Sequence, residues 1–165
     1  MKKIYIIGGP GSGKTFISKV ISKKTGIPFF ELDNIFWKDI FKYSQKEDQL
    51  IRDKNFKEIV SRSSWIVEGS YYKWIDEGFK NADIIVILNI SKIISSFRVI
   101  TRSIRERYSG ESKASFYSIY KMIKWGIGYD YKILPIIYKK ADKYKNKVVI
   151  ISSSKELSKL VYRIL

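Results

Sequence analysis

A glycine-rich segment near the N-terminus constrains this chain more than any other feature. It matches the pattern G-x-x-x-x-G-K-[ST], in which glycines let successive backbone N–H groups converge on phosphate oxygens. The lysine of the pattern supplies a mobile positive charge for the terminal phosphates, and the threonine hydroxyl can ligate a phosphate-bound Mg²⁺. We therefore predict that the chain binds ATP and Mg²⁺ through Gly8, Gly9, Pro10, Gly11, Ser12, Gly13, Lys14, Thr15 and Phe16.

The residues on either side of this segment strengthen the prediction. Residues 3–7 form a short, β-rich apolar run, and residues 16–24 show the helical period with apolar residues on one face. Gly26 and Pro28 end that helix. A strand, a glycine loop and a helix in this order direct a helix N-terminus at an anion, which favours a nucleotide site over a glycine-rich turn without a ligand.

Length and composition exclude several classes of protein. A chain of 165 residues predicts one domain, residues 1–165, with a hydrophobic core of its own. With no cysteine and no histidine, the chain has neither a disulfide framework nor the usual zinc ligands. No apolar run approaches the roughly 18 residues of a membrane span, and the first strand leaves no room for a signal peptide. We therefore expect a cytoplasmic protein with no membrane span and no obligate protein partner.

The formal net charge of +16 leaves two interpretations open. A strongly basic chain has affinity for polyanions, either nucleotides or nucleic acid, and the aromatic residues among the lysines of residues 114–145 could stack on bases. The alternative is a solvated basic surface and an amphipathic helix whose tyrosines are buried. Weak DNA binding through the basic surface is therefore a hypothesis only.

Strands and helices alternate along the chain, which predicts an α/β fold with a parallel sheet and helices on both of its faces. The expected strands are residues 3–7, 29–32, 65–67, 83–88 and 147–151. After the first helix, further helices are expected at residues 44–62, 71–79, 91–107 and 114–145, and after Ser153. Capping boxes mark two of these starts, one formed by Ser44 with Glu47 and one by Ser153 with Glu156.

Two acidic residues directly follow expected strands. Asp33 comes after the second strand, and Glu68, followed by Gly69, comes after the third. Ligands of open α/β sheets bind beyond the carboxyl ends of the strands, so Asp33 is a candidate for chemistry. For Asp33 the alternative is a carboxylate that only caps a turn.

The helix expected at residues 91–107 has two distinct sides. Four apolar residues fall on one side and three arginines form a stripe nearly opposite: Ile93, Phe97, Ile100 and Ile104 against Arg98, Arg102 and Arg105. The arginines are either a solvated face or a row of guanidinium groups that reach over bound phosphates. Residues 105–120, which contain Gly110, are the candidate lid.

Taken together, these motifs resemble one family. The chain is similar, nearly end to end, to the adenylate-kinase-like P-loop proteins of the DNA topology modulation (FlaR-related) family. The resemblance depends on the glycine-rich segment, on segments around Asp33 and Glu68, on two arginines and on an aromatic, basic helix. The residues concerned are Gly8–Thr15, Ile27-Pro28, Leu32-Asp33, Trp37, Trp65–Tyr71, Arg98, Arg102, Lys124-Trp125 and Tyr131-Lys132.

The resemblance implies a nucleoside-monophosphate-kinase fold, a three-layer structure with a five-stranded parallel sheet in the order 2-3-1-4-5 and a short lid. It implies that Arg98 stacks on the adenine, that Arg102 approaches the phosphates, and that the backbone around Ser153 lines the adenine pocket. It also implies that Asp33 contacts the acceptor or the metal shell. The chain departs from the family in its lid, where Arg107 stands in place of an arginine-rich segment.

We expect an ATP-dependent phosphotransferase that moves the γ-phosphate to a nucleotide or another small acceptor. The expected catalytic residues are Lys14, Asp33, Glu68, Arg102, Arg105 and Arg107, and the expected Mg²⁺ ligands are Thr15 and Asp33. One alternative is a nucleotide-gated, DNA-associated regulator with weak or no phosphotransfer. Another is a nucleotide-binding protein that has lost its chemistry, which the thinned lid makes credible.

Overall fold

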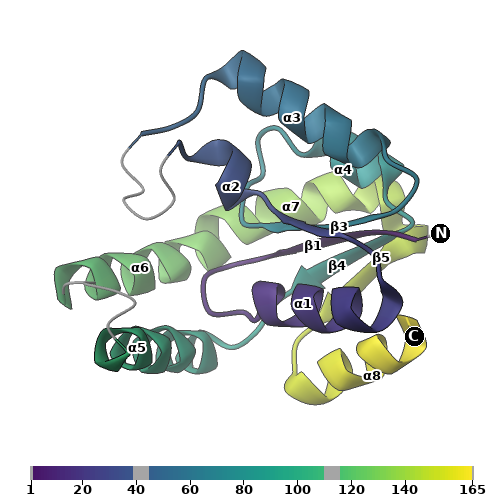
Figure 1. Cartoon of the computed structure of the whole chain (residues 1–165). Coiled ribbons are helices and arrows are strands. Elements are labelled where there is room, and N and C mark those ends of the chain that lie inside the picture. Colours follow the sequence, from purple (N-terminus) through teal and green to yellow (C-terminus); the bar gives the residue numbers. More distant parts are fainter. Residues whose placement is uncertain (1, 39–44, 110–115, 165) are drawn as a thin grey trace.

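A computed structural model describes residues 2–38, 45–109 and 116–164 (Figure 1). Its five strands form one parallel sheet in the order β2-β3-β1-β4-β5, which confirms the predicted fold class and strand order. The strands are β1 (Lys3–Gly8), β2 (Phe29–Glu31), β3 (Trp65–Gly69), β4 (Ile84–Leu88) and β5 (Val148–Ile151). Each lies within a residue or two of its predicted position.

The sheet separates two hydrophobic cores because successive side chains of a strand point to opposite faces. On β1, Tyr5 and Ile7 join a core with α3 (Gln49–Ser61), α4 (Asp76–Asn81) and α7 (Leu134–Ala141). Ile4 and Ile6 join the other core with α1 (Lys14–Thr25) and α8 (Ser154–Ile164). The chain therefore has the expected three layers, with the sheet between helices (Figure 1).

Two predicted helix starts are wrong. Helix α3 begins at Gln49, because the carboxylate of Asp48 caps it by accepting the N–H groups of Leu50 and Ile51. Ser44 of the predicted capping box lies outside the described residues. Helix α4 begins at Asp76 and not at residue 71, because the preceding residues hold aromatic rings against α2 (Asp33–Phe36).

The long helical segment after the candidate lid is continuous but irregular. Helix α6 (Phe116–Gly128) passes through a π-helical turn, η1 (Tyr129–Ile133), into α7 and then into the 3₁₀ turn η2 (Asp142–Lys147). Pro135 lacks the N–H that would donate to the carbonyl four residues earlier, and Leu134 donates to Tyr129 with π-helical spacing. One half of the predicted capping box of α8 is confirmed, since Ser153 Oγ accepts the Glu156 N–H at 3.2 Å, whereas the Glu156 carboxylate accepts the N–H of Ser152.

Helix α5 (Lys92–Tyr108) differs most from the usual amphipathic arrangement, in which the apolar side packs on the core. The buried residues of α5 are Val99 and Ser103, whereas Ile93 and Phe97 are 81% and 66% exposed.

Of the candidate lid, residues 110–115 lie outside the described residues, and α5 and α6 flank them. No helix in the described part of the chain is both long and apolar enough to span a membrane.

Candidate active site

The phosphate loop, residues 8–15, connects β1 to α1 at the carboxyl edge of the sheet. Gly11 and Gly13 have φ angles of +71° and +98°, which favour glycine, and a Cβ on Gly11 would also collide with the backbone oxygen of Ser95. Ser12 Oγ donates a hydrogen bond of 2.8 Å to the Gly9 carbonyl and braces the curve. The loop therefore has the tight bend that a phosphate cradle needs.

Lys14 is folded back over the phosphate loop. Its Nζ donates a 2.9 Å hydrogen bond to the Gly9 carbonyl. Burial lowers the pKa of this ammonium, and the carboxylates of Glu68 and Asp33 oppose that shift. Lys14 therefore lies close enough to the two predicted acids, Glu68 and Asp33, for their charges to act on its pKa.

Glu68, one of the two acids near Lys14, is buried, with 4% of its surface exposed. It lies on β3, which pairs with β1, and its Oε1 accepts a 2.7 Å hydrogen bond from Thr15 Oγ1. Burial raises the pKa of Glu68, whereas Lys14 and the Thr15 hydrogen bond counteract the rise. Pairing with β1 is what brings this carboxylate to the first turn of α1.

Thr15 and Glu68 fit a Mg²⁺ site. Mg²⁺ in phosphate sites usually takes one or two carboxylate or hydroxyl oxygens from the protein and fills its shell with phosphates and water. The described residues contain no cluster of three or more acidic side chains that would form a complete protein cage. One hydroxyl and one carboxylate beside the loop lysine suit a metal that arrives with the nucleotide.

Asp33 is the first residue of α2, and its position is set by a tyrosine that we did not predict as part of the site. The Tyr71 hydroxyl donates a 2.6 Å hydrogen bond to Asp33 Oδ1. The rings of Tyr71 and Trp74 pack on Phe36 with centroid distances of 4.5 and 6.3 Å. The sequence did offer a signal, because Tyr71 belongs to the turn after the third strand that ends in Glu68 and Gly69.

The arginines of α5 lie at different distances from the loop. Arg98 is half-buried, and its Nη1 approaches the Ser12 carbonyl at 3.4 Å. Arg102 is directed elsewhere, with contacts of 3.6 Å to Met122 Sδ and to Glu106 Oε1. Arg105 and Arg107 are exposed near the end of α5. Arg98 therefore contacts the phosphate loop directly, and Arg102 is near enough to Lys14 for its charge to lower the pKa of that ammonium.

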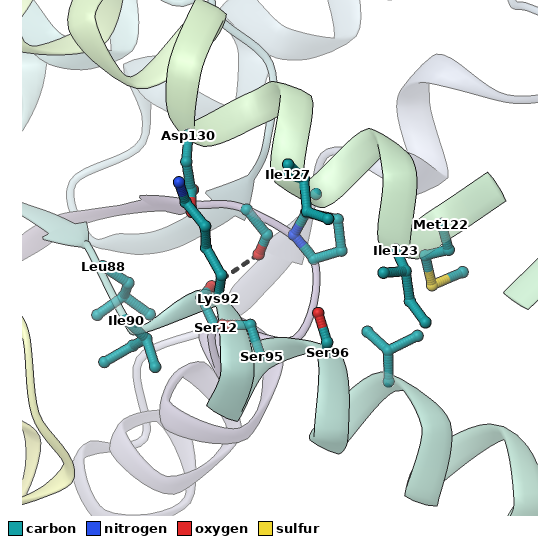
Figure 2. Close-up of a pocket in the computed structure, with 14 residues that line it drawn as sticks. Ser12, Leu88, Ile90, Lys92, Ser95, Ser96, Met122, Ile123, Ile127 and Asp130 are labelled. Atoms are coloured by element: carbon teal, nitrogen blue, oxygen red, sulfur yellow. Dashed lines mark hydrogen bonds between the residues drawn. The ribbon is translucent and has the colours of Figure 1, made fainter. Parts of the chain in front are cut away.

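Figure 2 shows where the loop meets the helices. A small cavity of about 20 Å³ lies between Ser12, the start of α5 at Ser95 and Ser96, and the α6 residues Met122 and Ile123. Two further predicted nucleotide contacts, Phe16 and Ser153, are not among the residues that line this cavity. The Phe16 ring is 71% exposed at the start of α1, and Ser153 is half-buried at the cap of α8.

The fold and this loop define the chain as a P-loop NTPase with a small-molecule kinase fold. The sequence model of the ATPase family associated with various cellular activities (AAA) matches residues 4–165, and the chain belongs to that family.

The chain is similar to small-molecule kinases over most of its length. It is 30% identical over 136 residues to a shikimate kinase of Clostridium botulinum, which covers 72% of this chain and 82% of that kinase. It is 29% identical over 133 residues to the uncharacterized protein YqaC of Bacillus subtilis, which covers 78% of this chain and 73% of YqaC. The shikimate kinase supports a kinase-like nucleotide-binding protein, and the narrower resemblance to DNA topology modulation proteins stays a prediction.

Solved structures show the same fold. The shikimate kinase from Acinetobacter baumannii in complex with shikimate matches with a TM-score of 0.66 at 16% identity, covering 99% of this chain and 90% of that one. A gluconokinase from Sinorhizobium meliloti matches with a TM-score of 0.57 at 16% identity, covering 99% and 89%. At this identity the likeness concerns the fold and not the substrate.

Proposed function

We propose that the protein is an ATP-dependent phosphotransferase that moves the γ-phosphoryl group of ATP to a hydroxyl of a small acceptor. One observation carries the proposal. The phosphate loop, the Thr15–Glu68 pair and the Tyr71–Asp33 pair lie at the same edge of the sheet, and both carboxylates act on the charge of Lys14. Phosphoryl transfer needs mainly alignment and neutralisation of charge, which such a set of residues supplies.

The nucleotide would be held by the loop. Backbone N–H groups of residues 11–15 and the Lys14 ammonium would bind the β- and γ-phosphates, with Lys14 exchanging its bond to the Gly9 carbonyl for phosphate oxygens. Thr15 and Glu68 would hold Mg²⁺, with Asp33 as the other carboxylate near it. A bound Mg²⁺ neutralises phosphate charge. Arg98 and the backbone at Ser153 are the expected contacts of the adenine.

Asp33 would act on the acceptor. The acceptor oxygen attacks the γ-phosphorus as the bond to the β–γ bridging oxygen breaks, ADP leaves, and the hydroxyl proton passes to the Asp33 carboxylate. Tyr71 keeps one oxygen of that carboxylate in place, so the other is available to orient the hydroxyl. Arg102, whose charge already acts on Lys14, would stabilise the transferred group in place of its contacts with Glu106 and Met122, with Arg105 or Arg107 as a second cation.

The test is ADP formation in the presence of Mg²⁺ and a panel of hydroxylated acceptors. Lys14→Ala should abolish acceptor-dependent ADP formation, whereas Lys19→Ala, an exposed lysine on the same helix, should leave it unchanged. ADP formation at the parent rate by Lys14→Ala would end the proposal. Tight ATP binding without turnover across the panel would favour a protein that has lost its chemistry.

A further inference from the structure

A groove of about 510 Å³ opens along α6, η1 and Tyr72, on the side of α6 away from the cavity in Figure 2. Its volume lies in the range of sites for small organic ligands. Six of its lining residues carry the chemistry discussed below: Tyr72, Lys121, Lys124, Trp125, Tyr129 and Lys132. Three of these six are cationic and three are aromatic, and none of the described lining residues is acidic.

The lysines of the groove are exposed and concentrated on one side of the helical run. Within the part of the chain that the structure describes, no carboxylate forms an ion pair with Lys124 or Lys132. Lysines nearby are different: Lys140 on α7 binds Asp76 at 2.7 Å, and Lys92 lies 3.4 Å from the centroid of the Tyr131 ring. Ammonium groups without a carboxylate partner among the described residues, as on Lys124 and Lys132, attract an anion.

The aromatic residues give the groove a second property. Trp125 is 48% exposed, and its ring meets Tyr129 edge to face at a centroid distance of 5.7 Å. An indole held in this way offers a flat surface to another ring. The π-helical turn at Tyr129–Ile133 directs both Tyr129 and Lys132 to the groove, and such turns are frequent at functional sites.

Two lining residues connect the groove to the proposed active site. The Tyr129 ring packs on Gly9 of the phosphate loop, where a Cβ would come within 3.1 Å of it. Tyr72 follows Tyr71, whose hydroxyl holds Asp33. A molecule in the groove would therefore be one aromatic ring, that of Tyr129, away from the phosphate loop, and would contact the residue next to Tyr71.

We infer that this groove binds the phosphoryl acceptor, and that the acceptor is an organic anion with a ring. The lysines bind its anionic group and Trp125 binds its ring, which leaves a hydroxyl for Asp33. A phosphomonoester and a carboxylate share this chemistry, so both are tested. The inference rests on the proposed function, because it assigns the acceptor of that reaction.

The experiment is calorimetric titration with ADP and Mg²⁺ in excess, so that phosphate probes do not occupy the loop. AMP and shikimate represent ring-bearing anions, adenosine lacks the anion, and gluconate lacks the ring. At least one of AMP and shikimate should bind saturably, and adenosine and gluconate should bind at least about tenfold more weakly. Adenosine binding as tightly as AMP, or gluconate binding alone, would overturn the inference.

Variants then locate the site. The double variant Lys124→Gln/Lys132→Gln should weaken anion binding by at least about tenfold, because each lost charge-assisted hydrogen bond reduces affinity. Lys139→Gln, an exposed lysine of α7 outside the groove, should bind as the parent does. All three side chains are exposed, so circular dichroism should show unchanged folding. Equal affinities of the double variant and Lys139→Gln would contradict the groove as the site.

The two proposals fail in different ways. Anion binding in the groove without any phosphoryl transfer would sustain the site and reject the kinase. Phosphoryl transfer that is unaffected by the double variant and prefers gluconate would sustain the kinase and reject the acceptor assignment.

Discussion

Helices α1 and α5 both begin beside the phosphate loop and both have an apolar side, but only one of these sides is buried. On α1, Ile21 is fully buried against the sheet, whereas on α5, Ile93 is 81% exposed. Helix α1 packs on β1, β2 and β3, while α5 packs chiefly on α6 (Figure 1). The helical spacing of apolar residues therefore shows which of them share a face, and the arrangement of the other elements decides whether that face is buried.

The charged groups of the site also differ in burial between the sheet and α5. Glu68 belongs to the sheet, is almost fully buried, and is bonded to Thr15. The Arg102 side chain belongs to α5, is 54% exposed, and contacts Glu106 and Met122. The half of the site that rests on the sheet is therefore held by buried contacts, whereas on α5 Arg98 contacts the loop and Arg102 contacts Glu106 and Met122.

The largest expected difference between the halves is catalytic. Glu68→Gln should lower kcat/KM by about a thousandfold, because it removes the only carboxylate bonded to Thr15 among the described residues. Arg102→Gln should lower it by only about tenfold, provided that α5 keeps its position. Steady-state kinetics with a fixed acceptor measures both. If Arg102→Gln costs as much as Glu68→Gln, α5 closes onto the phosphates during turnover and the contrast disappears.

The pH dependence of the parent sharpens this prediction. Glu68 must be ionised to bind Mg²⁺, so its raised pKa should make kcat/KM fall on the acid side at a higher pH than an ordinary glutamate would. Lys14 must be protonated to pair with phosphate, so its lowered pKa should bring the alkaline fall to a lower pH than an ordinary lysine would. Glu68→Gln should lose the contribution of Glu68 to the acid limb, so that this limb changes its position, and should keep the alkaline limb.

Much of the half of the site that rests on the sheet could be predicted from the sequence, because short continuous segments specify the positions of its residues. The glycine pattern places Lys14 and Thr15 on one turn, and short apolar strands place Asp33 and Glu68 at one edge. The surroundings of α5 depend on long-range packing, which no periodicity encodes. The same limit hid the Tyr71–Asp33 bond, since these residues are 38 positions apart.

Stability should show the contrast between the apolar faces of α1 and α5. Ile21→Ala should reduce the free energy of unfolding by about 3 kcal/mol, because it leaves a cavity between α1 and the sheet. Ile93→Ala should change it by no more than about 0.5 kcal/mol, because this side chain is mostly exposed. Urea denaturation of both variants provides the comparison. A large cost for Ile93→Ala would show that the apolar side of α5 is covered in solution.

A smaller effect is expected where the two halves touch, at Gly11. Gly11→Ala should cost about 2 kcal/mol, because the new Cβ meets both a positive φ and the backbone of Ser95 on α5. Gly26→Ala is the matched control: it has the same φ of +71° with no neighbour within 4 Å, so it should cost about 1 kcal/mol. Equal costs in thermal or urea unfolding would mean that α5 moves away from the loop without penalty.

The smallest effect should come from the hydrogen bond that joins Asp33 to the turn after β3. Tyr71→Phe removes the hydroxyl that holds Asp33 Oδ1 and keeps the ring on Phe36, so kcat should fall about tenfold while the KM for ATP stays the same. Tyr162→Phe, on an exposed tyrosine of α8, should change neither quantity. A raised KM for ATP with unchanged kcat would place Asp33 in nucleotide binding and not in the transfer step. In that case even a carboxylate of the sheet-backed half would lack the assigned role, and the division between the two halves would hold for packing but not for chemistry.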